Sequence, residues 1–295
     1  RGDGFGRGQG GGTIVLKRLS DALADGDTIL ALTRGSAVNQ DGRSNGLTAP
    51  NGKAQEAVIR AALANGKVDP AKVSYLEAHG TGTSLGDPIE VRALGNVFGE
   101  SHSSVNPLLV GSVKTNLGHL EAAAGIVGLV KIVLSLQNKA IPPHLHFHEP
   151  NPYIPWDQLP VTVPTKLTPW NVEAGAQRIA GLSSFGFSGT NAHMVIAEVP
   201  EQTKISKQQN RPIQLFTLTA KTKTSLEQLA ESYEGYLRKN ESVPLEQITS
   251  FVNTGRSHFS ERLALLAESA AQAQEKLANW KQGSEVDDLF TGTTS

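Results

Sequence analysis

Two histidines stand in surroundings where an imidazole can do chemistry. His79 lies in the stretch EAHGTGT, directly after a predicted strand, where glycines let the backbone turn sharply beside a ligand. His119 ends the stretch SVKTNLGH, at the entrance to a predicted apolar helix, where the helix dipole disfavours imidazolium. A neutral imidazole can donate a hydrogen bond to an oxygen that becomes negative in a transition state, and Lys114 can add a cation. Either histidine alone is more often a core residue, but two at strand ends favour a site.

Two glycine patterns match a dinucleotide-binding site and a serine-hydrolase elbow, but neither has the flanking elements that those sites require. Gly6-x-Gly8-x-x-Gly11 has the spacing of a dinucleotide fingerprint, which requires a preceding strand and a following helix. The β-rich TIVL follows here instead, which favours a flexible segment or a tight turn. Ser84 matches the G-x-S-x-G nucleophile elbow of serine hydrolases, but a true elbow opens directly into its helix. Ser84 is predicted to lie in a longer loop, so the hydrolase remains a remote alternative.

Three further histidines alternate in HLHFH. His144, His146 and His148 would point to one side of a strand, as zinc or copper ligands do. The segment lies between proline-rich stretches, and Glu149 is the one carboxylate close by in the sequence. Surface histidines without a metal are the favoured interpretation, and no metal site is predicted.

The elements that must position these residues alternate between strands and helices. Strands are predicted over Thr13–Leu19, Thr28–Ala37, Val73–Ala78, Leu108–Val113, Gln177–Ser183 and Ala192–Val199, the last two as a hairpin. Helices are predicted over Lys53–Ala64, with a left-handed cap at Asn65-Gly66, from Asp87 as N-cap onward, and over His119–Leu136. The last is apolar on nearly every face and is expected inside the protein. The pattern indicates a layered α/β domain.

A second, smaller unit is expected after the first. We expect one domain over residues 1–199, a polar connector over 200–212 and an α+β unit over 213–295. In the last, a strand at Ile213–Leu218 precedes helical patterns at Ser225–Arg238 and Arg262–Trp280.

Composition excludes several classes of protein. The 295 residues carry 27 Lys+Arg against 28 Asp+Glu, which gives no electrostatic footprint for nucleic acid or an anionic membrane. No run of about 18 apolar residues is present, so no transmembrane helix is expected, and a cytoplasmic location follows. The absence of Cys excludes thiol catalysis and Cys-ligated metal centres from this stretch.

Several long motifs carry a family resemblance. EAHGTGT (Glu77–Thr83), KTNLGHLEAAAG (Lys114–Gly125) and GLSSFGFSGTNAH (Gly181–His193) resemble the C-terminal signature stretches of β-ketoacyl synthases. VNQDGRSNGLTAPNG (Val38–Gly52) is similar to the version in modular type I polyketide synthases. NTGRSHFSERLALLAES (Asn253–Ser269) resembles the linker that leads from such ketosynthases to an acyltransferase.

The resemblance implies a fold, a reaction and partners. The family has the thiolase fold, a layered αβαβα arrangement of which this chain would hold a part, and usually forms homodimers. It elongates a polyketide chain by decarboxylative Claisen condensation of an acyl thioester with a malonyl-type extender. The domain itself binds no cofactor, because substrates are carried on the phosphopantetheine of an acyl carrier protein. That carrier protein and an adjacent acyltransferase are the implied partners, with no nucleic acid and no membrane.

The resemblance also assigns roles to residues. His79 and His119 match the catalytic histidines, which would hydrogen-bond the extender's thioester oxygen, and Lys114 matches the lysine that orients His119. Three groups of matches remain: hydroxyls that hold the pantetheine arm, a phenylalanine that gates the acyl pocket with a second beside it, and a structural asparagine. These are Thr81 and Thr83, Phe187 with Phe185, and Asn191.

The chain departs from the family in one respect. Ketosynthases carry a nucleophilic cysteine in a Thr-Ala-Cys-Ser-type turn, upstream of the glycine-rich stretch with which this sequence opens, and here no Cys exists. We therefore interpret the sequence as the C-terminal portion of a ketosynthase followed by its linker. The alternative is a structural or docking piece without turnover of its own.

Overall fold

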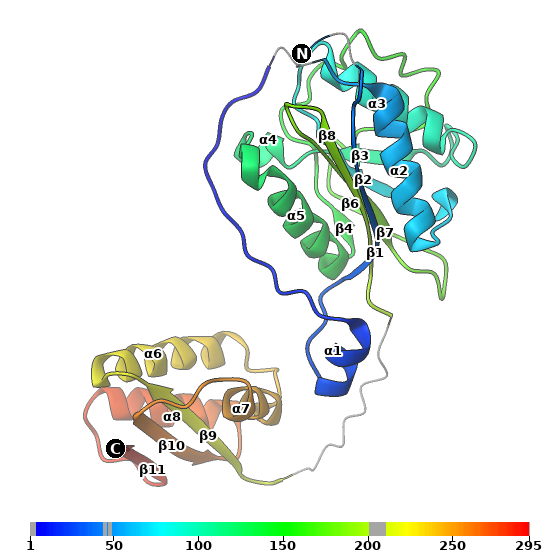
Figure 1. The fold of residues 1–295 in the computed structure, drawn as a ribbon. Coiled ribbons are helices and arrows are strands. Elements are labelled where there is room, and N and C mark those ends of the chain that lie inside the picture. Colours follow the sequence, from blue (N-terminus) through cyan, green and yellow to red (C-terminus); the bar gives the residue numbers. More distant parts are fainter. Residues whose placement is uncertain (1–3, 44–45, 47–48, 201–210, 295) are drawn as a thin grey trace. The chain divides into compact units, whose positions relative to one another are not determined.

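The short apolar segments of the first two-thirds of the chain form one six-stranded sheet (Figure 1). A computed structural model describes residues 4–43, 46, 49–200 and 211–294, and the chain folds as two units, Arg1–Thr203 and Lys204–Ser295. The sheet of the first unit has the order β1-β8-β7-β2-β3-β5. Its strands are β1 (Leu32–Gln40), β8 (Thr190–Ala197), β7 (Ile179–Phe185), β2 (Tyr75–Glu77), β3 (Leu108–Gly111) and β5 (Val161–Thr162). A separate ladder joins β4 (Ala140–Ile141) to β6 (Thr168–Pro169).

Strand direction divides this sheet into two halves. Strands β7 and β8 form the predicted hairpin, and β1 adds to it antiparallel. Strands β7, β2, β3 and β5 run parallel, with Glu77 of β2 opposite both Leu182 of β7 and Gly111 of β3. Parallel strands end at the same edge of a sheet, so whatever follows Glu77, Gly111 and Phe185 meets there.

Helices cover both faces of this sheet (Figure 1). Helices α2 (Gly52–Gly66) and α3 (Gly86–Phe98) pack on one face, where Ile59, Leu94 and Phe98 are buried against the strands. Helix α5 (Ala124–Asn138) packs on the other face through Leu129, Ile132 and Leu136. The remaining helical segments are α1 (Leu19–Asp25), α4 (Lys114–Leu117) and the 3-10 turns Pro70–Lys72 and Glu121–Ala123. The first unit is thus a three-layer α/β/α domain, with one core on each side of the sheet.

Helix α5 differs from its prediction in two ways. It begins at Ala124, after a 3-10 turn, and not at His119. It is also not buried all round, because Val130 is 41% and Leu134 52% exposed. Within the described part of the chain, Glu121–Asn138 alone is long and apolar enough to cross a membrane by length and composition. That is weak evidence for a span, since a helix with one face in a protein core meets the same test.

Other local predictions were wrong at the ends of elements. Thr13–Leu19 forms no strand, and most of it is irregular up to the start of α1. The left-handed residue after α2 is Lys67, with φ 49°, rather than the preceding glycine. Asp87 lies inside the first turn of α3, whose N-cap is Leu85, and its side chain accepts a hydrogen bond from the Gly82 N–H instead.

The second unit is a three-stranded antiparallel sheet with helices packed on it. Its elements are β9 (Gln214–Ala220), α6 (Lys223–Lys239), α7 (Leu245–Thr254), β10 (Glu261–Ala267), α8 (Ala270–Lys281) and β11 (Leu289–Thr293), with strand order β11-β10-β9. Phe216, Leu237 and Leu265 lie in its core. The predicted helix Arg262–Trp280 is in fact strand β10 followed by α8, whose N-cap Ser269 accepts a hydrogen bond from the Gln272 N–H. Most of the expected polar connector 200–212 lies outside the described residues.

One buried histidine is expected to make the stability of the first unit depend on pH. His193 of β8 is 1% exposed, and its Nδ1 shares a 3.0 Å hydrogen bond with the Ser183 hydroxyl. Its Nε2 has no partner among the described atoms. Burial lowers the pKa of His193 to about 3, so the ring is neutral in the folded protein at neutral pH.

Acid is therefore expected to destabilise the first unit through His193. The unfolded chain binds a proton near pH 6.5 that the folded chain does not take up until about pH 3, so stability falls as pH falls through that range. The contribution is about 1.4 kcal/mol per pH unit. Denaturant unfolding at several pH values should give a shallower pH dependence for His193→Gln. The exposed His148→Gln is the control, and equal slopes in all three proteins would contradict this account.

Candidate active site

The residues of the predicted site lie at the edge where the parallel strands end. His79 follows β2 by two residues, Lys114 follows β3 by three, and Phe187 follows β7 by two. The Ala78 N–H donates to the Gly111 carbonyl at 2.8 Å, which extends the pairing of β2 and β3 towards the site. The ring centroids of His79 and His119 are 5.5 Å apart, nearly perpendicular. Two residues separated by forty positions in the sequence thus become neighbours.

His79 is fixed through its backbone by a buried carboxylate. The Glu90 side chain of α3 accepts the N–H of His79 at 2.8 Å and that of Gly80 at 2.9 Å, one on each oxygen. The pKa of Glu90 is raised to about 7, mainly by burial and also by the nearby Asp87 charge, while the two backbone donors and Lys114 oppose the shift. Glu90 therefore holds the start of the His79 loop as a backbone anchor.

His119 is oriented through one ring nitrogen. It lies between α4 and the following 3-10 turn, so the predicted position at a helix N-terminus is wrong. The Glu121 N–H donates to its Nδ1 at 2.9 Å. A neutral imidazole that accepts at Nδ1 carries its proton on Nε2, which leaves Nε2–H as a donor.

The glycine-rich opening of the chain crosses both histidine loops. We call residues 4–8 the strap. The Gly4 N–H donates to the Gly82 carbonyl at 2.9 Å, while His119 donates its N–H to Gly6 at 2.8 Å and accepts that of Gly8 at 3.0 Å. The Phe5 ring lies 4.7 Å from the His119 ring. A Cβ on Gly8 would lie 2.2 Å from the Leu117 carbonyl oxygen, so only glycine fits there.

Burial and a shared cation keep both imidazoles neutral. Burial, then the charges of Lys114 and His119, lower the pKa of His79 to about 3. Burial and then Lys114 also lower the pKa of His119. The pKa of Lys114 is itself lowered by burial, which its carboxylate neighbours partly offset. Two neutral donors beside a partly buried cation can stabilise negative charge that develops on one oxygen.

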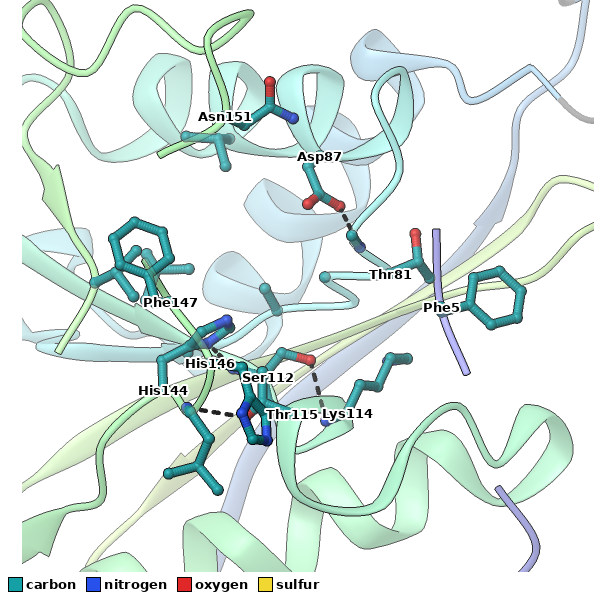
Figure 2. Close-up of a pocket in the computed structure, with 18 of the residues that line it drawn as sticks. Phe5, Thr81, Asp87, Ser112, Lys114, Thr115, His144, His146, Phe147 and Asn151 are labelled. Carbon is teal, nitrogen blue, oxygen red and sulfur yellow. Dashed lines mark hydrogen bonds between the residues drawn. The ribbon is translucent and has the colours of Figure 1, made fainter. Parts of the chain in front are cut away.

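A cavity of about 330 Å³ lies next to these loops (Figure 2). Lys114 lines it, whereas His79 and His119 are represented in the lining only by their chain neighbours Ala78, Gly80 and Gly118. Lys114 and Thr115 line it on one side, Thr81 and Asp87 on another, and the apolar Phe147 faces them. Its mixture of apolar walls and a few polar groups is typical of a site for a small organic group. Among the residues that the structure describes, no group of three or more His, Asp or Glu side chains is placed to hold a metal ion.

His144 is not the surface histidine that the sequence favoured. It lines the cavity, and the Ser112 N–H donates to its Nδ1 at 3.2 Å. Burial, then the charge of Lys131, lower the pKa of His144 to about 4. His146 and His148 are exposed, as predicted. The alternation failed as a guide because His146 takes φ 60° in a turn, so the segment is not a strand.

The other predicted residues are divided between the site and its surroundings. Thr81 lines the cavity, with its hydroxyl oxygen 3.4 Å from that of Thr83, which accepts the Gly86 N–H. Phe185 packs against the core, with its ring 5.7 Å from His79, whereas Phe187 is 76% exposed.

In the described part of the chain, Asn191 and Ser84 form no hydrogen bond with His79 or His119. Asn191 is buried, and its Nδ2 donates to Asn39 and Asp41 across the β1–β8 ladder, which suits a structural role. Ser84 is exposed in the turn before α3, and the described residues show no hydrogen bond from it to a histidine.

Sequence reasoning missed the carboxylates that support the site. Asp87 and Glu90 stand three residues apart on α3, so both project from one face of the helix towards the preceding loop. Glu77 of β2 is 1% exposed. The signal was present in acidic residues at i and i+3 at a helix start, and in an acidic residue at the end of an otherwise apolar strand.

Comparison with known proteins gives consistent matches. Residues 30–148 match the family model for the β-ketoacyl synthase C-terminal domain, and residues 150–265 match that for the ketoacyl-synthetase C-terminal extension. A phenolphthiocerol/phthiocerol polyketide synthase of Mycobacterium tuberculosis is 59% identical over 199 residues, which cover 68% of this chain and 11% of that protein. Erythronolide synthase EryA3 of Saccharopolyspora erythraea is 42% identical over 99% of this chain and 9% of its own length. The chain thus spans about a tenth of these relatives.

Solved structures agree in fold. An oxazolomycin ketosynthase domain from Streptomyces albus superposes with a TM-score of 0.91 at 34% identity, over 100% of this chain and 51% of that one. The ketosynthase from module 6 of the bacillaene synthase of Bacillus subtilis gives 0.84 at 38% identity, over 94% and 48%. The predicted thiolase-like fold, present in part, is confirmed.

Neutralising Lys114 should raise the pKa of both site histidines. The Lys114→Met substitution removes the cation that helps to depress both values, so each ring should protonate at a higher pH. NMR titration of the imidazole Cε1–H signals measures this directly. His144 is the internal control, because burial and Lys131 set its pKa rather than Lys114. An unchanged His119 titration would show that Lys114 does not act on that ring.

Proposed function

The chain belongs to the β-ketoacyl synthase family, and we propose that its residues form the decarboxylating half of a polyketide ketosynthase site. One observation carries this proposal: the ring centroids of two neutral imidazoles, His79 and His119, lie 5.5 Å apart near the partly buried cation of Lys114. Such a pair suits a reaction whose costly intermediate is an oxyanion. A malonyl-type thioester, which becomes an enolate when it loses carbon dioxide, is a substrate of that kind.

The proposed step needs no added base. The bond between the α-carbon and the carboxylate of the extender breaks, and its electron pair passes to the thioester oxygen as carbon dioxide leaves. His79 and His119 donate hydrogen bonds to that oxygen as its charge grows. The enolate carbon then attacks an acyl thioester held on a cysteine, a new carbon–carbon bond forms, and the cysteine thiolate is released. No Cys exists in these 295 residues, so another part of the protein must supply it.

The surroundings of the site suit a substrate held on a long arm. Thr81 lines the cavity and the Thr83 hydroxyl lies 3.4 Å from that of Thr81, which suits the binding of a phosphopantetheine arm. We therefore propose an acyl carrier protein as the partner that delivers the extender, with an adjacent acyltransferase and a homodimer as the assembly, in the cytoplasm. The second unit, which includes the Asn253–Ser269 motif, would serve as the linker to that acyltransferase.

The second candidate function is a structural or docking role. The zero count of Cys favours it for this chain taken alone. The two candidates differ in what the histidines contribute, since a docking piece needs neither ring.

Replacing either histidine should slow decarboxylation strongly. In a ketosynthase completed by an N-terminal part that carries the cysteine, His79→Ala and His119→Ala should each lower the rate of carbon dioxide release from a malonyl carrier protein by about 10²- to 10³-fold, the usual cost of one lost oxyanion donor. Folding should persist, and the exposed His148→Ala is the control. Wild-type rates in both variants would reject the decarboxylase and leave the docking role.

Phe187 should act on acyl-chain access rather than on stability. It is 76% exposed in the β7–β8 turn, so Phe187→Ala should change the free energy of unfolding by less than about 0.5 kcal/mol. In the ketosynthase completed by an N-terminal part that carries the cysteine, Phe187→Ala should alter acylation rates across thioesters of increasing chain length. Phe185→Ala is the matched comparison, because that ring packs against the core and its loss should destabilise the unit. Acylation rates unaffected by Phe187→Ala at every chain length would remove the gate.

A further inference from the structure

A buried polar cluster lies directly behind the candidate site. Lys131 of α5 forms an ion pair with Glu77 of β2, with its Nζ 2.8 Å from Oε2, and the two side chains are 9% and 1% exposed. The Tyr75 hydroxyl donates to the same oxygen at 2.6 Å. The other oxygen, Oε1, accepts the Val113 N–H. Every oxygen of this buried carboxylate is therefore hydrogen-bonded, as a buried charge requires.

This cluster does little for the stability of the fold, or lowers it. An ion pair taken out of water adds little stability compared with an apolar packing of the same volume. Helix α5 also carries Gly128 in its interior, where glycine weakens a helix. A Cβ there would lie 3.2 Å from Cγ of Glu77 and 2.8 Å from Leu182, so the glycine makes room for the carboxylate.

We propose that Glu77, Lys131 and Tyr75 are positioning residues that hold His79 and Lys114 in register with one another. This inference rests on the proposed function of those two residues. Glu77 is the last residue of β2 and precedes His79 by two positions. The Glu77 carboxylate binds the N–H of Val113, the residue just before Lys114. One carboxylate thus ties together the two strand ends that carry the site, and Lys131 anchors it to α5.

The cluster also sets the electrostatic potential at Lys114. Burial lowers the pKa of Lys114, the carboxylates Glu90, Glu77 and Asp87 raise it, and Lys131 lowers it. The other titratable groups near the site are His79, His119 and His144, which are neutral at the pH where a lysine titrates. The two partners of the ion pair therefore act on Lys114 in opposite directions.

The test is the titration of Lys114 in this chain, followed by NMR of the lysine ε-CH₂ groups and assigned with Lys114→Arg. Glu77→Gln should lower the pKa of Lys114, and Lys131→Met should raise it. The double variant E77Q/K131M should return it towards the wild-type value. A purely structural role predicts loss of stability without this opposite pair of shifts. If Glu77→Gln does not fold, Lys131→Met and the double variant still carry the comparison.

A second arm measures catalysis in the ketosynthase completed with its cysteine. Each single variant should lower kcat for decarboxylation by about 10- to 100-fold with KM nearly unchanged, as expected when a catalytic group is displaced by a fraction of an ångström. The double variant should recover part of the loss. The matched control is R178M/E198Q, which removes a partly buried ion pair, 2.8 Å long, at the opposite end of β7.

Two results would overturn the inference. One is the same direction of shift at Lys114 in Glu77→Gln and Lys131→Met, and the other is a wild-type kcat in both. The lysine titration does not depend on turnover, so it tests the cluster even where the His79 and His119 variants reject the proposed function.

Discussion

The register of three parallel strands is the constraint on which the site depends. Glu77 of β2 pairs with Gly111 of β3 on one side and with Leu182 of β7 on the other. A shift of one residue in either pairing would turn alternate side chains to the opposite face of the sheet. The loops after these strands carry the histidine, the lysine and the phenylalanine turn, so the pairing of the strands brings all three loops to one edge of the sheet.

Burial at this edge of the sheet shifts the pKa values of the titratable site residues. Burial lowers the pKa of His79, His119 and Lys114 and raises that of Glu90, so each group is pushed towards its neutral form. A site of suppressed charges has little solvent to reorganise when charge appears on a substrate oxygen. The backbone hydrogen bonds to Glu90 compensate for part of the cost of burying a carboxylate there.

Much of this could be predicted from the sequence, because the strand–helix alternation and the long motifs are local signals. The helix Lys53–Ala64 and the β7–β8 hairpin lie where their patterns indicate. His144 was misjudged because its place in the cavity brings it to the backbone N–H of Ser112, which is distant in the sequence. Arg262–Trp280 was misjudged because its apolar residues suit a strand followed by a helix as well as one helix. Nothing in the sequence indicates that Glu77 and Lys131 form an ion pair, because fifty-four positions separate them.

The strap holds the backbone of His119 through peptide groups, with the Gly6 carbonyl and the Gly8 N–H on either side of it, while the Phe5 ring lies 4.7 Å from the imidazole. A peptide group is the same whatever side chain it bears, so these two hydrogen bonds do not need the Arg7 side chain, which pairs with Glu121 instead. What cannot vary is the lack of a side chain at position 8. The position of this histidine therefore depends in part on a residue that has no side chain, and a search for side chains that contact the ring would pass over that residue.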